Sequence, residues 1–501
     1  MAERFQSDNM VTRIPQAHAV LSVAEMYAAD RAAAAAGIDT LDLMEAAGRG
    51  VADVIRARWP RQAVAVLCGP GYNGGDGFVI ARLLAADGWN VRLTLLGSQT
   101  DLRGDAAVNA QRWCDAGGKV EPLNVAILDG APLVVDALFG AGLSRELSGV
   151  ARDCVARINA EKLDCVAVDV PSGVSGDSGE VLGIAPQCAA TVTFFRRKPA
   201  HLLYPARALC GDITVVDIGI PEAVLTDIAP LTAHNLPGLW TLRQPRWDDH
   251  KYARGAAIVI GGGEVTGASR LAARAARRVG AGLLTLAVPP AALPIYAAAE
   301  PGCFVQPLSG IADLDRMLSD KRRNGVLIGP GAGVGMATCV NVLRILSTDK
   351  AVVLDADALT SFRDDPASLF AAIKRRSAPV VLTPHQGEFE RLFKITGDKL
   401  VRARAAAAES GAIVVLKGSD TVVASPDGRA AIADNAPPWL ATGGTGDVLA
   451  GLTLGLLVQG LPAWEAAAAA VWLLGAAGGH LGPGLIAEDL PEALPKVLKA
   501  L

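Results

Sequence analysis

The sequence has few aromatic residues and no run of charge of a single sign. Aromatic residues make up 5% of its 501 residues and hydrophobic residues 51%, an imbalance that reflects Ala, Val, Leu and Gly. This composition suits helices packed closely on buried parallel strands. The net charge is −4, and no basic stripe is present, since the cluster Arg196-Arg197-Lys198 is short. We therefore expect no nucleic-acid partner.

The eight cysteines include no C-x-x-C pair, which excludes the common metal-ligand spacing and argues against a disulfide framework. They predict reduced thiols in a cytoplasmic protein. Residues 1–16 lack the apolar core of a signal peptide. The Ala-rich run from 466 to about 486 contains Gly, Pro and His480, so it predicts a core helix rather than a membrane span.

Strand–loop–helix units occur in two series, which predicts an α/β fold with parallel sheets and ligands at the carboxyl ends of the strands. The length favours two or three domains. Four prolines interrupt the pattern between 221 and 254, so we place domains at 1–225 and 226–501. The expected strands are 64–67, 91–96, 133–136, 165–170, 213–218, 256–260, 283–288, 325–328, 351–354, 379–382 and 413–416.

The first glycine-rich segment, residues 69–77, is expected to form a loop before a helix at 78–86, and it contains a G-x-G-x-x-G pattern. The next strand ends without the acid that binds ribose in an ordinary dinucleotide domain, which disfavours that class. Asn73 and Asp76 are also compatible with helix capping, and Asp136 and Asp169 with strand-end turns. Because three strands deliver an acid or amide to one sheet edge, a ligand site is favoured.

The second glycine-rich segment, residues 441–447, precedes an apolar helix and predicts an anion cradle for phosphate. Asp447 in the first helical turn is compatible with simple helix stabilisation. An acid beside a phosphate cradle is better explained as a general base for an attacking hydroxyl. We favour a ligand contact for His385, one of six histidines, and place 329–333, 355–358 and 417–421 at the same rim.

Residues 15–225 resemble the epimerase domain of the bifunctional NAD(P)H-hydrate repair family, whose block G-P-G-N-N-G-G-D-G has Tyr72 at its first Asn position here. The resemblance implies that Asp169 contacts substrate at the reacting end and that K⁺ is bound by Asn73, Asp136 and Ser172. The residues that follow Lys198, Pro199-Ala200-His201, depart from the family pattern, and Lys198 is left out of the catalytic residues. The implied substrate-binding residues are Tyr72, Asn73, Gly74, Gly75, Asp76, Gly140, Ala141, Gly142, Leu143, Ser144, Arg145, Glu146 and Asp169.

Residues 226–501 resemble the ribokinase-like ADP/ATP-dependent NAD(P)H-hydrate dehydratases. The shared stretches, in order, are 250–251, 329–333, 355–359, 383–388, 417–421 and 435–451. The resemblance implies that Asp447 is the catalytic base and that Ala268, Gly331 or Gly333, and His385 contact substrate beside it. The implied nucleotide-binding residues, for ADP or ATP with Mg²⁺, are Lys417, Gly418, Ser419, Asp420, Thr421 and Gly446.

The two resemblances imply repair of hydrated NADH and NADPH (NADHX and NADPHX). One domain interconverts the two epimers, and the other phosphorylates the S hydrate and expels phosphate to restore the ring. Two three-layer αβα domains are expected, Rossmann-like and then ribokinase-like, in a cytoplasmic homo-oligomer that binds no membrane. The alternative is a small-alcohol, vitamin-precursor kinase with a non-catalytic N-terminal binding domain, which the Tyr72 substitution keeps open.

Overall fold

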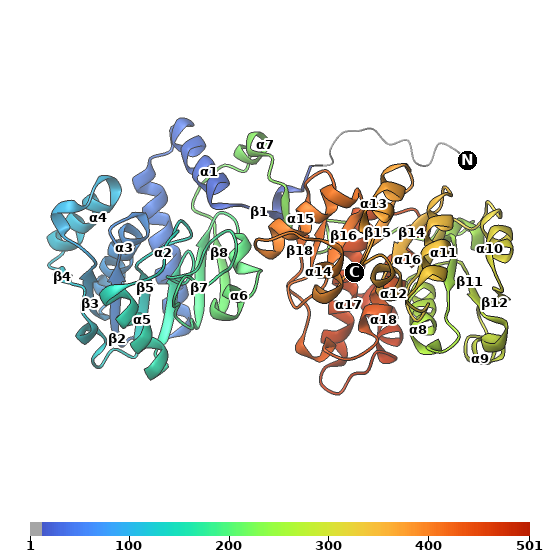
Figure 1. Ribbon diagram of the computed structural model, residues 1–501. Coiled ribbons are helices and arrows are strands. Elements are labelled where there is room, and N and C mark those ends of the chain that lie inside the picture. Colours follow the sequence, from blue (N-terminus) through green and yellow to red (C-terminus); the bar gives the residue numbers. More distant parts are fainter. Residues whose placement is uncertain (1–12) are drawn as a thin grey trace. The chain divides into compact units, whose positions relative to one another are not determined.

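The computed structural model describes residues 13–501, which form two compact units (Figure 1). The N-terminal unit spans Ala19–Pro230, and the C-terminal unit combines the segment ending at His18 with Leu231–Leu501. The predicted domain limits, 1–225 and 226–501, differ from these units at the boundary and in the assignment of the first segment. The prediction that residues 1–16 contain no signal peptide falls largely outside the described residues, because the structure does not describe residues 1–12.

The N-terminal unit is built on a parallel sheet in the order β4-β3-β2-β5-β6-β7-β8. After β2 the chain adds β3 and β4 on one side of that strand and then returns to add β5 on the other side. The boundary between β2 and β5 is therefore a topological switch point, where α/β folds bind ligands. The strands are β2 (Ala63–Cys68), β3 (Asn90–Leu95), β4 (Glu121–Pro122), β5 (Leu133–Ala137), β6 (Asp164–Val168), β7 (Ala190–Phe194) and β8 (Asp212–Val216), and the two-residue strand β1 (Ala19–Val20) precedes them in the chain.

Alternate residues of β2 pack into two different cores, as the two-residue period of a strand requires. Val64 and Val66 pack with helices α2 to α4, whereas Ala65 and Leu67 pack with α5 on the opposite face. The sheet therefore forms the middle of three layers. The helices are α1 (Val23–Ala35), α2 (Thr40–Arg58), α3 (Tyr72–Ala86), α4 (Gly104–Asp115), α5 (Gly149–Glu161), α6 (Ala206–Leu209) and α7 (Val224–Ile228).

The C-terminal unit has a larger sheet in the order β9-β18-β17-β16-β15-β14-β13-β10-β11-β12, in which only β17 runs antiparallel to its neighbours. Its topological switch point lies between β10 and β13, which pair in parallel. The strands are β9 (Thr232–His234), β10 (Ala256–Ile260), β11 (Leu283–Val288), β12 (Phe304–Pro307), β13 (Gly325–Ile328), β14 (Ala351–Leu354), β15 (Val380–Leu382), β16 (Ile413–Leu416), β17 (Val422–Ala424) and β18 (Ala430–Ile432).

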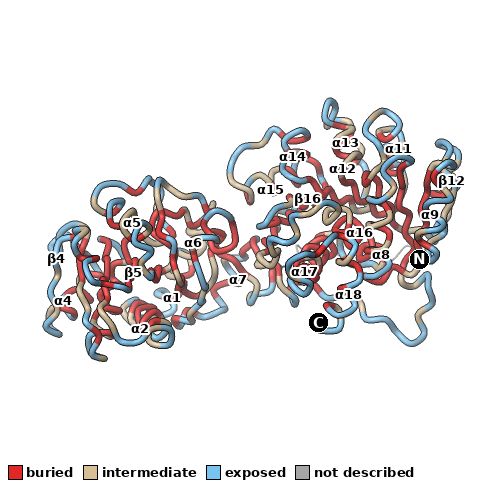
Figure 2. Tube along the Cα trace, turned by 90° about the horizontal axis from the view of Figure 1, so that it is seen from below, coloured by how far each residue is buried: buried red, intermediate tan, exposed pale blue. Residues whose placement is uncertain are grey.

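Helices cover both faces of this sheet, and its central strands are buried (Figure 2). Ala257 and Val259 pack with α8, α16, α17 and α18, while the alternate residues Ile258 and Val326 are equally buried on the opposite face. The helices are α8 (Thr266–Arg278), α9 (Leu293–Ala299), α10 (Ile311–Leu318), α11 (Met336–Leu346), α12 (Ala356–Ser361), α13 (Pro366–Lys374), α14 (Gln386–Leu392), α15 (Lys399–Ser410), α16 (Thr445–Val458), α17 (Ala463–Leu481) and α18 (Asp489–Lys499).

The predicted α/β class with parallel sheets is confirmed, and each of the eleven expected strands lies on an observed one within two residues. The strands not predicted from the sequence are β1, β4, β7, β9, β12, β17 and β18. All of these except β7 have only two to four residues, which contain little apolar period. Strand β7 (Ala190–Phe194) has five residues and alternates Thr with apolar residues.

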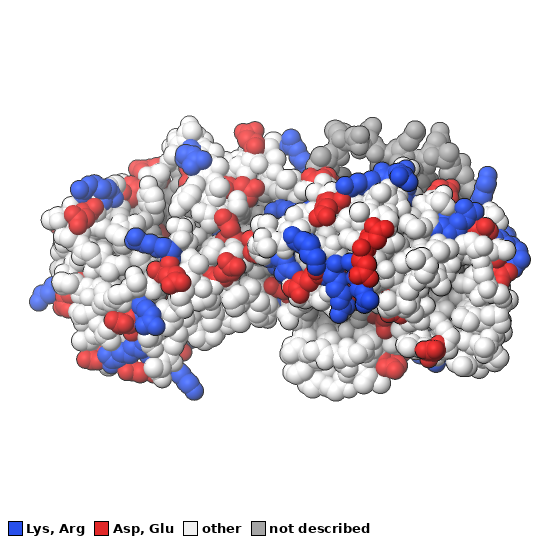
Figure 3. All heavy atoms as spheres, in the orientation of Figure 1, with Lys and Arg blue, Asp and Glu red and all other residues white. Residues whose placement is uncertain are grey.

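The Ala-rich segment expected to be a core helix forms α17 (Ala463–Leu481). Within residues 13–501, no helix combines the length and apolarity that a membrane crossing needs. On the face shown in Figure 3, acidic and basic side chains are interspersed.

Helix α16 packs against α8 at very short distance through two glycines four residues apart. A Cβ at Gly451 would lie 2.1 Å from the carbonyl oxygen of Ala272, and a Cβ at Gly455 would lie 2.6 Å from that of Ala276. Residues four apart lie on one face of a helix, so the two glycines form one contact surface. This contact fixes the helix whose N-terminal turn carries Asp447.

Gly451→Ala should lower the free energy of unfolding of the C-terminal unit by about 1–3 kcal/mol, because the added methyl group must displace backbone atoms of α8. Gly479→Ala in α17 is the matched control, since a Cβ at that position would meet no described atom within 4 Å. That change should raise stability by about 0.5–1 kcal/mol. Denaturant titration of both variants measures the difference, and equal stabilities would contradict the packing argument.

Candidate functional site

Helix α3 begins at the carboxyl end of β2, at Tyr72, with Gly71 as its N-cap. The expectation that residues 72–77 form a loop is therefore wrong: they are the first turns of the helix. The capping alternative for Asn73 and Asp76 is also wrong, since no side chain caps α3. Gly69 and Gly74 matter for packing, because a Cβ at Gly69 would lie 1.7 Å from the carbonyl oxygen of Leu138. Because Gly69 and Gly74 have no side chains, α3 can lie close to the end of β5.

Asp169 and Lys198 form an ion pair at the ends of β6 and β7. The Lys198 ammonium lies 2.7 Å from Oδ1 of Asp169 and donates to Thr193 Oγ1 at 2.8 Å. The backbone amide of Ala141 donates to the other carboxylate oxygen at 2.9 Å. The Asp169 backbone has a φ of 68°, and Nε2 of His201 lies 2.8 Å from its carbonyl oxygen. A strained backbone held by so many contacts is typical of a functional position.

These contacts decide the charge of Asp169. Burial alone would raise its pKa, but the Lys198 ammonium and the Ala141 amide lower the pKa to about 2. Burial, together with the charge of Lys198, lowers the pKa of His201 to about 4. At neutral pH the site therefore holds an ionised carboxylate and a neutral imidazole.

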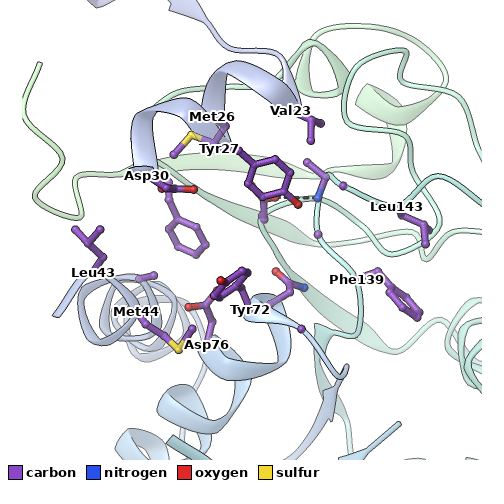
Figure 4. Close-up of a pocket in the computed structure, with 18 of the residues that line it drawn as sticks. Val23, Met26, Tyr27, Asp30, Leu43, Met44, Tyr72, Asp76, Phe139 and Leu143 are labelled. Carbon is purple, nitrogen blue, oxygen red and sulfur yellow. Dashed lines mark hydrogen bonds between the residues drawn. The ribbon is translucent and has the colours of Figure 1, made fainter. Parts of the chain in front are cut away.

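A cavity of about 800 Å³ opens in front of this ion pair (Figure 4). Helix α1 forms one wall with Tyr27 and Asp30, which project toward Tyr72 and Asp76 on α3. Tyr72 is 69% exposed. Among the predicted substrate residues, those that line the cavity are Tyr72, Asn73, Asp76, Gly140, Ala141, Gly142, Leu143, Ser144, Arg145 and Asp169.

Three predicted substrate residues are not among those that line the cavity. Gly74 and Gly75 face inward, where a Cβ would meet the backbone of Gly69 and the sulfur of Met44 respectively. Glu146 lies beside Gly183, at the far end of its loop. Their packing explains the glycines without a ligand.

Two further carboxyl groups in the cavity have raised pKa values. Burial raises the pKa of Asp30 to about 6 against the opposing charge of Lys198. Burial and then the charge of Asp169 raise the pKa of Asp76 well above its usual value. One ionised carboxylate and two that resist ionisation thus share a single cavity, an arrangement that separates acid and base roles.

Of the predicted K⁺ ligands, Asp136 and Ser172 contact each other, and Asn73 lies on its own beside Gly140. Asp136 is fully buried and accepts from the amide of Ser172 at 2.8 Å and its hydroxyl at 2.6 Å. Among the described residues it has no ion pair with Lys or Arg, and burial raises its pKa. Asn73 lies beside Gly140, with its amide nitrogen buried and unbonded to any described residue. The oxygens of Asp136 and Ser172 are of the kind that a monovalent cation accepts, whereas the unbonded Asn73 nitrogen is a donor and would not be a ligand.

Lys198, Asp30 and Tyr27 were missed as site residues in the sequence. Lys198 was set aside because the residues after it depart from the family pattern, yet its ammonium is the partner of Asp169. Asp30 and Tyr27 lie in an Ala-rich helix that carries no motif. Helical spacing alone does not show which face of α1 lines a cavity formed by β2, β5 and β6.

The second candidate site lies at the N-terminus of α16, where Gly444 caps the helix with a φ of 94°. Asp447 is half-buried in the first turn, as predicted from the sequence. Burial and the neighbouring Asp355 carboxylate raise its pKa to about 7, against the opposing charge of Lys417. A carboxyl group with this pKa can accept a proton at neutral pH and remain a stronger base than an ordinary aspartate.

Lys417 joins the strand-end acids of this site. Its ammonium lies 2.9 Å from Oδ1 of Asp355 and 3.8 Å from Oε2 of Glu388. Burial would lower the pKa of Lys417, but these two carboxylates hold the pKa above its usual value. A Cβ at Gly446 would lie 3.4 Å from the same ammonium, so α16 also contacts this group.

The remaining predicted residues of the second site lie on loops or in first helical turns near Asp355, Glu388 and Lys417, or in the turn directly after Lys417. The amide of Gly333 donates to Asp357 Oδ2 at 2.9 Å, and Gly331 lies against Val265, three residues before Ala268. His385 caps α14 through Nδ1, while its side chain stays 54% exposed. In the 418–421 turn, Thr421 Oγ1 donates to the carbonyl of Gly418 at 2.8 Å, Asp420 pairs with Lys399, and Ser419 is exposed.

Fold and sites together define a two-site α/β enzyme. One unit offers a cavity with acid–base groups, and the other offers a helix N-terminus with a base suited to a phosphorylated substrate. A family model described as NAD(P)H-hydrate dehydratase matches residues 256–496, and one described as YjeF-related protein N-terminus matches residues 40–200.

Full-length relatives share both units. The bifunctional NAD(P)H-hydrate repair enzyme Nnr of Salinibacter ruber is 38% identical over 523 aligned residues, covering 95% of this chain and 96% of its own length. The enzyme of the same name from Thermofilum pendens is 36% identical, covering 96% of each chain. A crystal structure of the ADP/ATP-dependent NAD(P)H-hydrate dehydratase from Bacillus subtilis with ATP and Mg²⁺ is 29% identical and covers 52% of this chain and 94% of its own, with a TM-score of 0.46.

The chain belongs to the family of bifunctional NAD(P)H-hydrate repair enzymes. The expected family is thereby confirmed, together with the pairing of its two domains. The alternative of a vitamin-precursor kinase fused to a non-catalytic domain does not account for relatives that match both units over almost their whole length.

Lys198→Met should destabilise the N-terminal unit by about 3–5 kcal/mol, because it leaves the buried Asp169 carboxylate without its cation. The pKa of Asp169 should rise, since the Ala141 amide then opposes the effect of burial without the Lys198 ammonium. The double variant Lys198→Met/Asp169→Asn should recover much of the loss, and Lys119→Met, outside the cavity, should change little. Thermal and denaturant unfolding of the four proteins tests the pair; no recovery in the double variant would contradict it.

Proposed function

We propose that the protein repairs hydrated NADH and NADPH: the N-terminal unit interconverts the R and S hydrates, and the C-terminal unit dehydrates the S hydrate with ADP or ATP. The observation that carries the proposal is the position of Asp447, a base with a pKa of about 7 in the first turn of a helix whose N-terminus suits phosphate. Family membership supplies the pairing of the two reactions.

The dehydration requires activation of a poor leaving group. The hydrate carries a hydroxyl on the carbon next to the ring nitrogen, and hydroxide leaves slowly. Asp447 would remove the hydroxyl proton while the oxygen attacks the terminal phosphorus of the nucleotide. The nitrogen lone pair then expels phosphate, and loss of a ring proton restores the nicotinamide. Gly443, Gly444 and Gly446 would receive the phosphate. The residues beside the hydrate would be Ala268, Gly331, Gly333 and His385.

The nucleotide would lie along residues 417–421, whose exposed turn offers backbone groups, with Gly446 next to its phosphates. Mg²⁺ commonly enters such sites on phosphate oxygens with one or two protein carboxylates. Asp355, Asp357 and Glu388 supply hard oxygen ligands here, although the described residues contain no three-ligand cluster that would bind the metal alone. The ion would offset negative charge on the transferred phosphoryl group.

The epimerisation takes place in the cavity of the N-terminal unit. Asp169 would contact the substrate at the reacting end, held ionised by Lys198 and aimed by Thr193 and the Ala141 amide. A potassium ion bound by Asn73, Asp136 and Ser172 would neutralise the buried Asp136 carboxylate. Tyr72 at the mouth would pack on the substrate in place of the usual amide. A homo-oligomer in the cytoplasm, without nucleic-acid or membrane partners, remains part of the prediction.

Asp447→Asn should lower the rate of S-hydrate dehydration by at least about 100-fold, because the amide cannot accept the hydroxyl proton. Nucleotide binding should persist, since the helix N-terminus is unchanged. In the wild type, dehydration at low substrate should fall as the pH drops below about 7, where Asp447 becomes protonated. Recovery of NADH absorbance from hydrated NADH with ADP or ATP measures both effects.

The exposed Asp364→Asn, on the same unit, serves as the control and should retain full activity. An Asp447→Asn variant that restores NADH at the wild-type rate would contradict the assignment of the base. Wild-type protein that restores NADH from neither epimer with either nucleotide would contradict the proposed function itself.

Asp169→Asn should slow repair of the R hydrate by at least about 100-fold while repair of the S hydrate continues at the wild-type rate. The physical reason is that only the R hydrate must pass through the N-terminal cavity. Purified epimers, supplied separately and corrected for spontaneous interconversion, distinguish the two routes. If the variant still clears both epimers equally fast, Asp169 does not act in epimerisation.

A further inference from the structure

Helix α1 places one stripe of side chains in the wall of the cavity. Val23, Tyr27, Asp30 and Ala34 follow the three- and four-residue spacing of a single helix face and all line the cavity. Ala29 and Ala33, on another face, are fully buried in the core. The register of α1 is thus fixed by alanine packing, and Asp30 is directed to the cavity rather than to bulk solvent (Figure 4).

The Asp30 carboxylate has no partner within residues 13–501. Its side chain makes neither a hydrogen bond nor an ion pair with any described residue, although Arg31 is its neighbour in sequence. The carboxylate is half-buried and open to the cavity, so its partners there are water or a bound substrate.

Charged groups reach Asp30 from each wall. Lys198 and Asp169 face it from the ends of the β7 and β6 strands, Arg31 and Tyr27 from its own helix, and Asp76 from α3. Asp169 is paired with Lys198, whereas Asp30 and Asp76 are not paired with any described cation. In many active sites, a carboxylate that is paired with a cation and a carboxyl group that is not, such as Asp169 and Asp30, take opposite proton-transfer roles.

We propose that Asp30 is a catalytic residue of the epimerisation, the proton donor and acceptor for the ring nitrogen of the hydrate, acting opposite the Asp169–Lys198 pair. This inference rests on the proposed function, because the substrate it assumes is the hydrated cofactor. It assigns a chemical role to α1, a helix outside both glycine-rich segments.

The reaction conserves atoms and electrons without a further reagent. Asp169 accepts the proton of the hydroxyl group, the carbon–oxygen bond becomes a carbonyl, and the carbon–nitrogen bond breaks. The electron pair of that bond goes to nitrogen, which takes a proton from Asp30. Rotation of the resulting aldehyde presents its other face. Nitrogen then attacks it, the N–H proton returns to Asp30, and the oxygen recovers its proton from Asp169.

The titration of Asp30 suits this exchange. A group that both donates and accepts a proton works best when its pKa lies near the working pH, and burial raises the pKa of Asp30 to about 6. Because the donor must be protonated for ring opening, kcat/KM should fall as the pH rises through about 6. The expected profile therefore has a descending limb that belongs to Asp30.

The test measures epimerisation alone. Purified R hydrate is incubated with the full-length protein without nucleotide, so dehydration cannot occur, and the two epimers are separated by chromatography. Asp30→Asn should lower kcat by about 100-fold or more with little change in KM, and the descending limb near pH 6 should disappear. Asp30→Glu, which keeps the acid, should retain measurable activity and a descending limb.

Dehydration of the S hydrate reports only on the C-terminal unit, so thermal unfolding of the variant is measured as well to show that the N-terminal unit, which contains Asp30, is folded. Asp153→Asn is the matched control, an exposed carboxylate on α5 outside the cavity. Asp30→Asn should fold normally, because it removes a charge that burial opposes. A variant that keeps kcat and the descending limb, or that changes only KM, would overturn the catalytic role. Wild-type protein that fails to interconvert the epimers would instead overturn the proposed function.

Discussion

Backbone contacts at the carboxyl ends of parallel strands position both sites, and only glycine permits them. A Cβ at Gly69 would lie 1.7 Å from the Leu138 carbonyl oxygen, and a Cβ at Gly262 would lie 1.6 Å from that of Gly331. Each contact joins strand ends at the topological switch point of its sheet, β2 with β5 and β10 with β13. Because the backbones meet there, side chains from separate strands converge on one edge.

The same side-chain type acquires opposite properties at the two edges. Asp169 is held ionised by an ammonium, whereas burial and neighbouring carboxylates bring Asp447 to a pKa of about 7. Both are aspartates at the ends of elements in α/β units, so residue type does not set their behaviour. The lysine of each site sets this behaviour by its position. Lys198 forms an ion pair with Asp169, whereas Lys417 is paired with Asp355 rather than with Asp447.

Strands in the middle of the sheets were predictable because their apolar runs are bounded by Gly, Asp or Pro, as at 256–260 and 351–354. The short strands β4, at the edge of its sheet, and β18, between β9 and β17, were not, since two or three residues contain no period. The start of α3 was misplaced for a related reason: Gly74, Gly75 and Gly77 resemble a loop in sequence but lie inside the helix. Close packing requires them there, since Gly77 meets β2 and β5, Gly74 meets Gly69, and Gly75 meets Met44 on α2.

The two α/β units, the two glycine-rich segments and the acids Asp136, Asp169 and Asp447 could be predicted from sequence, because they follow strands or begin helices at fixed local spacing. The groups that meet in each site depend instead on how the elements pack. Lys198 reaches Asp169 across 29 positions of sequence, and Asp30 enters the cavity from a helix with no motif. Such pairings depend on how elements that are distant in sequence pack together, and local patterns of polar and apolar residues do not predict that packing.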